Sequence, residues 1–184
     1  MKISECDILI LPGLGGSKPG HWQMRWAERM ANAAVVEQAD WFEPDLDDWV
    51  ATIDQAARLT LRPVVLVAHS LAVTAVAHAA PLLPENVRGA FLVAPTDVEL
   101  SPAAPEETRI FGPIPRDPLP FPSMVVASSN DPYVSLDRAV EFATCWGSDF
   151  HQAGEAGHIN IDSGHGPWPE GLLMFTRLMQ RLRA

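Results

Sequence analysis

The chain is poor in cysteine and in positive charge. Its 184 residues include 13 Lys and Arg against 23 Asp and Glu, which gives a net charge of -10 at pH 7, and no basic cluster is present. Such a balance disfavours nucleic acid and acidic membrane surfaces as partners. The two cysteines, Cys6 and Cys145, lie far apart without metal-ligand spacing. Reduced thiols in a cytoplasmic protein are therefore favoured, with a single disulfide as the alternative.

Long apolar runs, repeats and linkers are also missing. The N-terminal stretch MKISECDILILPG has an apolar run of about five residues, preceded closely by Glu5 and Asp7. This run is too short for a signal peptide or a membrane span, so we expect no membrane partner. No low-complexity tract divides the chain, and 47% of its residues are hydrophobic. We therefore expect one compact domain over residues 1–184.

A complete nucleotide-binding motif is absent, although a glycine-rich segment covers residues 13–17. The dinucleotide pattern GxGxxG needs glycine where Lys18 stands, and the Gly-Lys-Ser/Thr of a phosphate-binding loop does not occur. These departures argue against a nucleotide-binding, flavodoxin-like domain. In serine hydrolases, a loop after an early strand supplies one backbone N–H to the oxyanion hole. Leu14 is our candidate for that donor, and a plain tight turn is the alternative.

The segment PVVLVAHSLA at residues 63–72 carries the strongest chemical signal. Four aliphatic residues, 64–67, predict a strand buried on both faces, and residues 71–78 are helical in composition. Ser70 would then sit on a sharp turn between strand and helix, as the nucleophile does in the pattern G-x-S-x-G. Alanines at positions 68 and 72 replace both glycines of that pattern. A buried serine that merely closes a strand is the alternative interpretation.

Strand and helix patterns alternate about six times along the chain. We expect an α/β protein with a mostly parallel sheet of about six strands and helices on both faces. The expected strands are 7–11, 34–38 at an edge, 64–67, 89–94, 124–128 and 149–153, and the expected helices are 21–30, 45–58, 71–78, 135–146 and one from 169 onward. Residues 95–122 contain eight prolines without periodicity, which indicates a loop beside the substrate cleft or a plain surface loop.

Acyl transfer through Ser70 needs a base and an acid that orients it. In an α/β-hydrolase these follow in the chain order Ser, Asp or Glu, His, each on a loop after a strand. Asp131 follows the fifth expected strand and is the favoured acid, with Asp97 as the alternative. The last loop holds two candidate bases, His158 and His165, and spacing favours His158 slightly.

Several longer runs resemble a known family. They are AHSLAV at 68–73, SSNDPYVS at 128–135, GHIN at 157–160 and GPWPEG at 166–171, with PG followed by HW near the N-terminus. Together they are similar to the small serine hydrolase family of retinoblastoma-binding protein nine and YdeN. The resemblance covers nearly the whole chain, and the pair GHIN and WPEG is its specific part.

The resemblance implies a compact α/β-hydrolase without a separate lid domain. It places the catalytic residues on Ser70, Asp131 and His158, and it makes His165 a loop residue. Family members act as esterases or other hydrolases, with an aminopeptidase-like or amidase-like role in some. The retinoblastoma-pocket motif L-x-C-x-E is absent, because Ser4 and Ala143 stand where leucine is required. That protein partner is therefore not expected here.

These observations predict a serine hydrolase that cleaves small carboxylic esters, or amides, without a metal or organic cofactor. Backbone N–H groups of Leu14 and Leu71 would form the oxyanion hole. An acyl pocket beside them and the 95–122 loop would favour short apolar acyl groups. The alternative is a catalytically weak binding protein that keeps the hydrolase fold and uses the 95–122 loop to hold a partner. The alanines at 68 and 72 motivate that alternative.

Overall fold

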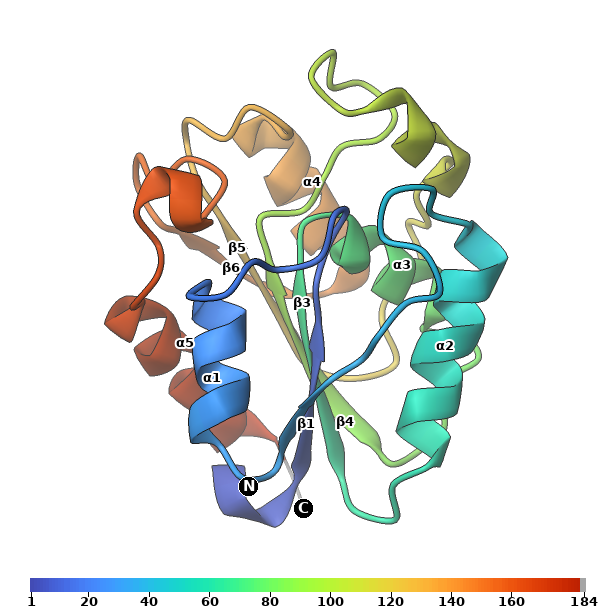
Figure 1. Cartoon of the computed structure of the whole chain (residues 1–184), viewed down its shortest axis with the longest axis vertical. Coiled ribbons are helices and arrows are strands. Elements are labelled where there is room, and N and C mark those ends of the chain that lie inside the picture. Colours follow the sequence, from blue (N-terminus) through green and yellow to red (C-terminus); the bar gives the residue numbers. More distant parts are fainter. Residues whose placement is uncertain (183–184) are drawn as a thin grey trace.

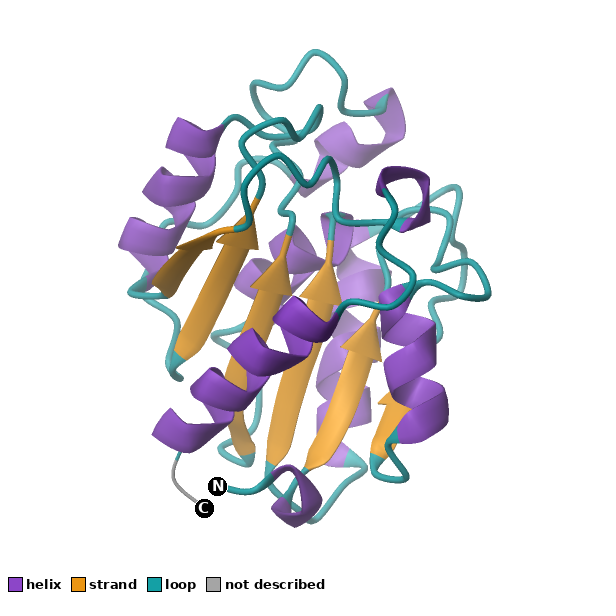
Figure 2. Cartoon of the chain, turned by 90° about the vertical axis from the view of Figure 1, so that its left-hand side faces the viewer, coloured by secondary structure: helices purple, strands orange, loops and turns teal. Residues whose placement is uncertain are grey.

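A computed structural model describes residues 1–182 and contains a six-stranded sheet in the order β2-β1-β3-β4-β5-β6. All neighbouring strands are parallel. The strands are β1 Asp7–Leu11, β2 Ala33–Val35, β3 Val64–His69, β4 Val87–Val93, β5 Ser123–Ala127 and β6 Asp149–Gln152. In Figures 1 and 2 the strands run toward the same, upper edge of the molecule. The predicted α/β fold class is thereby confirmed.

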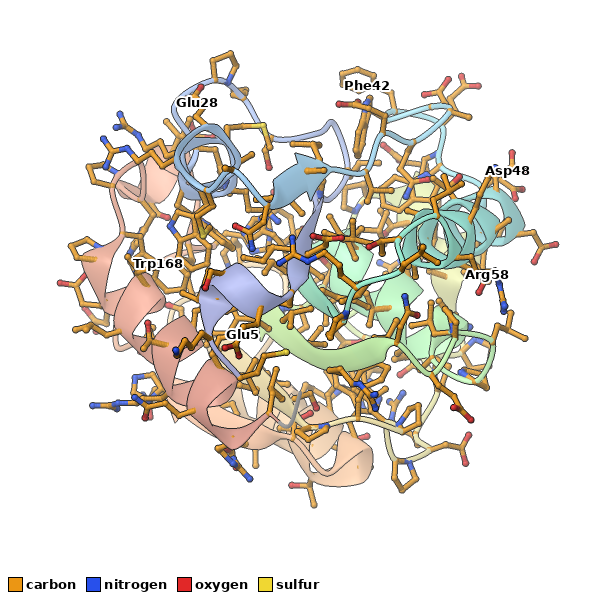
Figure 3. All side chains as sticks on the ribbon, turned by 90° about the horizontal axis from the view of Figure 1, so that it is seen from below. Glu5, Glu28, Phe42, Asp48, Arg58 and Trp168 are labelled. Atoms are coloured by element: carbon orange, nitrogen blue, oxygen red, sulfur yellow. The ribbon has the colours of Figure 1, made fainter. Side chains whose placement is uncertain are left out.

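Helices cover both faces of this sheet (Figure 2). They are α1 Trp22–Arg29, α2 Leu46–Arg58, α3 Leu71–Ala79, α4 Leu136–Trp146 and α5 Pro169–Arg181, with short 3₁₀ helices η1 Ile3–Glu5, η2 Glu106–Phe111 and η3 Ile161–Ser163. Helices α1 and α5 pack on one face, and α2, α3 and α4 pack on the other. Figure 3 shows Trp168 on the first side and Asp48 and Arg58 of α2 on the second. No separate lid domain is seen in residues 1–182.

The central strand β3 explains why the sheet needs cover on both sides. All six of its residues are buried. Leu66 and Ala68 pack in the core below α2 and α3, whereas Val65 and Val67 pack in the core below α1 and α5. Side chains alternate between the two faces of a strand, so a continuous apolar run fills both cores at once.

Element boundaries differ from the expected ones at several ends. The expected strand 34–38 ends at Val35, with one further bond from the Val36 N–H to the Ile10 carbonyl, and it lies at the sheet edge as expected. Strand β4 begins two residues earlier than expected. The 95–122 segment, expected to be a loop, contains the 3₁₀ helix η2, whose six residues lie between prolines 105 and 113 and are too few to produce a periodic pattern.

The chain changes direction between β1 and β3. From β1 it steps outward to β2, and it then returns across β1 to β3 and continues to β6. The loops that follow β1 and β3 therefore leave toward opposite sides, which opens a crevice at the carboxyl ends of these strands. The N-terminus and the last turn of α5 lie at the opposite, lower end in Figure 1. The polar residues singled out in the sequence follow strands at the crevice end.

Candidate active site

Ser70 occupies a strained turn between β3 and α3. Its backbone has φ 60° and ψ -128°, a region that residues other than glycine rarely adopt. Its N–H donates to the Val93 carbonyl at 3.0 Å, which ties the turn to β4. Ala68 and Ala72 are both buried, so the methyl groups fit where the usual pattern has glycine. The turn thus has the geometry of a nucleophile elbow despite the two alanines.

A chain of hydrogen bonds joins the three residues favoured from sequence. The Ser70 Oγ lies 2.8 Å from the His158 Nε2. The His158 Nδ1 lies 2.9 Å and 3.0 Å from the two carboxylate oxygens of Asp131. Because an ionised carboxylate only accepts, Nδ1 carries the proton of the neutral ring, and Nε2 is left as an acceptor for the Ser70 hydroxyl.

The loop after β5 holds the histidine loop by several bonds. Ser128 Oγ accepts from the Ala156 N–H at 2.9 Å, and Asn130 Oδ1 accepts from the Gly157 N–H at 2.7 Å. Asp131 itself accepts from the Tyr133 N–H at 2.9 Å, which fixes its carboxylate. The run SSND therefore positions the Asp131 carboxylate and also the loop that carries His158.

Ring N–H groups anchor the two carbonyls at and after His158. His69 Nε2 donates to the His158 carbonyl at 2.9 Å, and Trp22 Nε1 donates to the Ile159 carbonyl at 2.9 Å. Ile159 has a positive φ of 47°, an unfavourable conformation for a β-branched residue. The bonds from β3 and α1 thus hold a strained backbone directly beside the imidazole.

Aromatic packing explains the WPEG run. The Trp168 ring lies 5.1 Å from the Trp22 ring, centroid to centroid, in an edge-on arrangement. A Cβ atom at Gly171 would lie 2.1 Å from the Trp168 ring, so the first turn of α5 has room only for glycine there. Trp22 thereby connects α5 packing to the carbonyl that it holds beside the histidine.

Two further histidines behind the site are held neutral. Burial, with the nearby His158 as a smaller cause, lowers the pKa of His21 to about 4. Burial also lowers the pKa of His69 well below its usual range. His69 lies between the other two, with ring centroids 5.0 Å from His21 and 4.9 Å from His158. We refer to His21, His69 and His158 as the histidine cluster. Neutral rings at 21 and 69 add no positive charge next to His158.

The glycine-rich loop after β1 lies against Ser70. A Cβ atom on Gly13 would approach the Ser70 Cβ to 2.7 Å, so glycine permits this close contact. Leu14 follows directly and lines the same cavity as Ser70 and Leu71. Leu71 is the first residue of α3, and its N–H has no acceptor within the helix. Both residues expected to supply oxyanion donors thus line the cavity beside Ser70.

A buried amide bridges the two strands that lead to these donors. Gln23 Nε2 donates to the Leu11 carbonyl of β1 at 3.1 Å and to the Val67 carbonyl of β3 at 3.0 Å. Its Oε1 accepts from the Ser17 hydroxyl at 2.8 Å, so the amide oxygen is satisfied as well. Sequence analysis missed Gln23, for which the only signal was a polar residue beside the apolar stripe of α1.

The alternative acid, Asp97, has a different partner. Its carboxylate accepts from Arg138 Nε at 2.8 Å and from the backbone N–H of Leu100 at 3.0 Å. Hydrogen bonding to Asp97 raises the pKa of Arg138 above its usual value. The pair belongs to a set of five charged residues, which we call the ion-pair cluster: Asp97, Glu99, Arg116, Arg138 and Glu141. This cluster ties the proline-rich segment to α4.

The alternative base, His165, lies on the same loop but turns to other neighbours. Its Nδ1 lies 3.3 Å from the Ser163 Oγ, and its ring stands edge-on to Trp168 at 6.1 Å. It is not among the residues that line the Ser70 cavity. The structure therefore brings His158, and not His165, to the serine.

A cavity of about 320 Å³ opens above Ser70 and His158. Its wall is mainly apolar and comes from the glycine-rich loop, the loop before α2, the start of α3, the proline-rich segment, the loop after β5 and the η3 region: Leu14, Phe42, Leu71, Pro105, Tyr133 and Ile161. Thr96, which the sequence analysis did not single out, also lines it and lies 3.1 Å from the Ser70 Oγ. Phe42, labelled in Figure 3, is 72% exposed at the rim.

Residues 1–182 contain no group of three or more His, Cys, Asp or Glu side chains placed to hold a metal ion. Over the same range, every helix is too short or too polar to cross a bilayer.

Comparisons with known proteins agree with this geometry. A crystal structure from Pectobacterium atrosepticum, named as a YdeN-like hydrolase, is 34% identical with a TM-score of 0.86, over 97% of this chain and 93% of that one. The ydeN gene product from B. subtilis is 20% identical with a TM-score of 0.80, over 96% and 100%. Est1E from Butyrivibrio proteoclasticus shares the fold at 13% identity and a TM-score of 0.68, over 96% and 90%. No curated protein sequence matches significantly.

The resemblance to YdeN-like proteins expected from the sequence is confirmed by these structures. A family model described as serine hydrolase also matches residues 8–177, nearly the whole chain. The chain therefore belongs to the serine hydrolase family and is an enzyme with the α/β-hydrolase fold.

Proposed function

We propose that the protein hydrolyses small carboxylic esters, with amides as the second choice, through Ser70, His158 and Asp131. The continuous hydrogen-bond chain from the Ser70 hydroxyl to the Asp131 carboxylate is the observation that carries this proposal. Each link is within normal hydrogen-bond distance, and each residue has the chemistry that its role needs. The family match supports the reaction type, and the triad supplies the residues.

In the acylation step, the Ser70 hydroxyl proton moves to the His158 Nε2 while the Ser70 Oγ bonds to the substrate carbonyl carbon. The carbonyl oxygen takes up negative charge and accepts from the N–H groups of Leu14 and Leu71. Each such donor is worth roughly 3 kcal/mol of barrier. The proton on His158 then passes to the leaving alcohol. Water, deprotonated by His158, hydrolyses the acyl-enzyme in the same way. Asp131 orients the ring and stabilises the imidazolium.

The cavity supports a small, largely apolar substrate. Its volume of about 320 Å³ is at the lower end of the range for ligand sites. Leu14 and Phe42 contribute apolar surface, and the charged lining residues are Lys18 and Asp162, one of each sign. An uncharged ester fits this lining better than a strongly ionic substrate. We also propose a cytoplasmic location, which the two free cysteines support.

A fluorophosphonate probe tests the proposal directly, because it forms an adduct only with an activated serine. We expect one adduct per chain by intact mass, lost in Ser70→Ala and in His158→Ala. The matched control is His165→Ala, which lies on the same loop and should keep both the adduct and the hydrolysis of p-nitrophenyl acetate. Folded wild-type protein that does not react would overturn the proposal and favour a binding protein. Loss of labelling in His165→Ala alone would reassign the base.

A further inference from the structure

We infer that Thr96 is a further catalytic residue, whose hydroxyl donates a hydrogen bond to the Ser70 Oγ and stabilises that oxygen when it departs from the acyl group. This inference rests on the proposed function. The two hydroxyl oxygens are 3.1 Å apart. Thr96 is 3% exposed and lines the cavity, so this contact lies at the reacting atom and is shielded from water.

The direction of the hydrogen bond follows from counting protons. The neutral imidazole of His158 places its hydrogen on Nδ1, toward Asp131, so its Nε2 accepts the single hydroxyl hydrogen of Ser70. The Ser70 Oγ then has only lone pairs to offer to Thr96. The Thr96 hydroxyl is therefore the donor of the 3.1 Å contact. In this arrangement the Ser70 hydrogen is directed to the base.

Backbone strain independently marks the position of Thr96. Within residues 1–182, three residues other than glycine have a positive φ: Ser70, Ala94 and Ile159. Ser70 is the nucleophile, and Ile159 adjoins His158. Ala94, with φ 49°, comes two residues before Thr96. Each strained residue thus lies at, or within two positions of, one of the three side chains that meet at the Ser70 oxygen. Strain of this kind persists where the surrounding structure imposes it and gathers at functional sites.

Neighbouring bonds hold the strained segment in place. The Ala94 N–H donates to the Val126 carbonyl at 2.8 Å, and the Asp97 N–H donates to the Tyr133 carbonyl at 3.0 Å. The Thr74 hydroxyl donates to the Thr96 carbonyl at 3.3 Å. None of these bonds uses the Thr96 hydroxyl, which is left to the Ser70 oxygen. A valine at position 96 would keep all three.

The chemistry of deacylation gives this donor its largest effect. Water attacks the acyl carbon and gives its proton to the His158 Nε2, which forms a tetrahedral intermediate. When the intermediate collapses, the bond from carbon to the Ser70 Oγ breaks, and the oxygen takes the bonding electron pair. The proton on Nε2 then passes to this oxygen and restores the hydroxyl. Thr96 keeps its own proton throughout and donates a hydrogen bond to the oxygen as negative charge develops there.

The test compares Thr96→Val with Thr96→Ser, using p-nitrophenyl acetate and stopped-flow detection of the acylation burst. Valine keeps the shape and removes the hydroxyl, and serine restores the donor. We expect the deacylation rate of Thr96→Val to fall about tenfold, the loss of one neutral hydrogen bond. Acylation should fall less, so acyl-enzyme accumulates in intact-mass spectra. Thr96→Ser should recover most of the rate. Thr144→Val is the matched control, because its hydroxyl bonds the Val140 carbonyl on the exposed side of α4.

The outcomes separate this inference from the proposed function. If wild-type protein fails to react with the fluorophosphonate, the proposed function is wrong. If wild-type protein reacts and Thr96→Val deacylates at the wild-type rate, the role of Thr96 alone is wrong. Equal losses in the valine and serine variants also contradict it, since the hydroxyl would then not matter. Should Thr96→Val not fold, the same comparison is made between Thr96→Ala and Thr96→Ser.

Discussion

Two clusters of titratable side chains lie near the carboxyl ends of the strands. The structure favours neutral side chains in one cluster and charged side chains in the other. In the histidine cluster, burial lowers the pKa of His21 and of His69, so both rings are neutral next to His158. In the ion-pair cluster, hydrogen bonding to Asp97 raises the pKa of Arg138, and every member is charged. The histidine cluster places two neutral rings beside His158, and the ion-pair cluster holds the proline-rich segment against α4.

Two similarly placed aspartates, one bonded to the histidine cluster and one in the ion-pair cluster, have different partners. Asp131 and Asp97 each follow a central strand and each lie almost fully buried. Asp131 faces a ring that must gain and lose a proton, whereas Asp97 faces a guanidinium that never loses one. The partner, and not the position after a strand, decides which carboxylate can serve acid–base chemistry. Substitutions that treat the two clusters separately should therefore have separable effects.

The largest effect is expected for Asp131→Asn. An amide at this position donates its N–H₂ to the His158 Nδ1 and so moves the ring proton to Nε2, where it blocks acceptance of the Ser70 hydrogen. We expect kcat/KM to fall about 10⁴-fold with little change in stability. Ester hydrolysis and thermal unfolding measure the two quantities. The matched control, Asp137→Asn, changes an exposed acid in the first turn of α4 and should leave kcat/KM as it is.

Asp97→Ala should lower the stability strongly and kcat/KM little, the reverse of Asp131→Asn. It leaves the guanidinium of Arg138, which is 16% exposed, without its most buried partner. Removing one member of a buried pair typically costs about 3 to 5 kcal/mol of unfolding free energy. Urea unfolding measures this loss, with Asp117→Ala as the control for an exposed acid of the same segment. A fall in kcat/KM of the folded protein as large as that of Asp131→Asn would contradict the separation of the two clusters.

Acid should weaken the histidine cluster first. His21 has a folded pKa of about 4 against an unfolded value near 6.5, so the unfolded state binds its proton more readily. Above pH 6.5, His21 is neutral in both states and does not lower the free energy of unfolding. As pH falls from 6.5 to about 4 it removes about 3 kcal/mol of unfolding free energy. We expect His21→Asn, which keeps the cap on α1, to lose less stability than wild type between pH 7.5 and pH 5 in urea titrations. Parallel curves would show that His21 does not carry the effect.

The smallest effect is expected at the solvent edge of the ion-pair cluster. Glu141 is 42% exposed and pairs with both Arg116 and Arg138. Because solvent screens such pairs, Glu141→Gln should lower the unfolding free energy by less than about 1 kcal/mol. Ester hydrolysis should be unchanged. A loss as large as that of Asp97→Ala would mean that the cluster acts as one unit from core to surface.

Much of the architecture was readable from local patterns. The apolar run 64–67 and the repeated alternation of strands and helices predicted a parallel sheet, because strands buried on both faces are nearly continuous runs of apolar residues. The short edge strand at 33–35 was the least well predicted, since none of its three residues is fully buried and the middle one is exposed. The triad residues were favoured by chain order and family resemblance, and the structure brings them into contact, but their catalytic roles stay predictions.

Other site residues could not be predicted because their roles depend on distant contacts. Thr96 carries no motif, and only the placement of β4 beside β3 brings its hydroxyl to Ser70. Likewise, no local pattern predicts that the His69 ring donates to the carbonyl of His158. These contacts join residues 26 and 89 positions apart, which local sequence patterns do not encode.

Gln23 fixes the spacing of β1 and β3 at the site. Its amide donates to carbonyls of both strands just before the segments that carry Leu14 and Leu71. The distance between these segments is therefore held by one side chain. A tilt or slide of helix α1 would therefore move the segments that carry Leu14 and Leu71, the proposed oxyanion donors. Phe42 and Pro105 line the cavity from the loops before α2 and after β4, so substitutions there can alter substrate scope while the Gln23 bridge keeps the spacing of β1 and β3 constant. Helix α1 thus sets the distance between the two strands whose following loops flank Ser70.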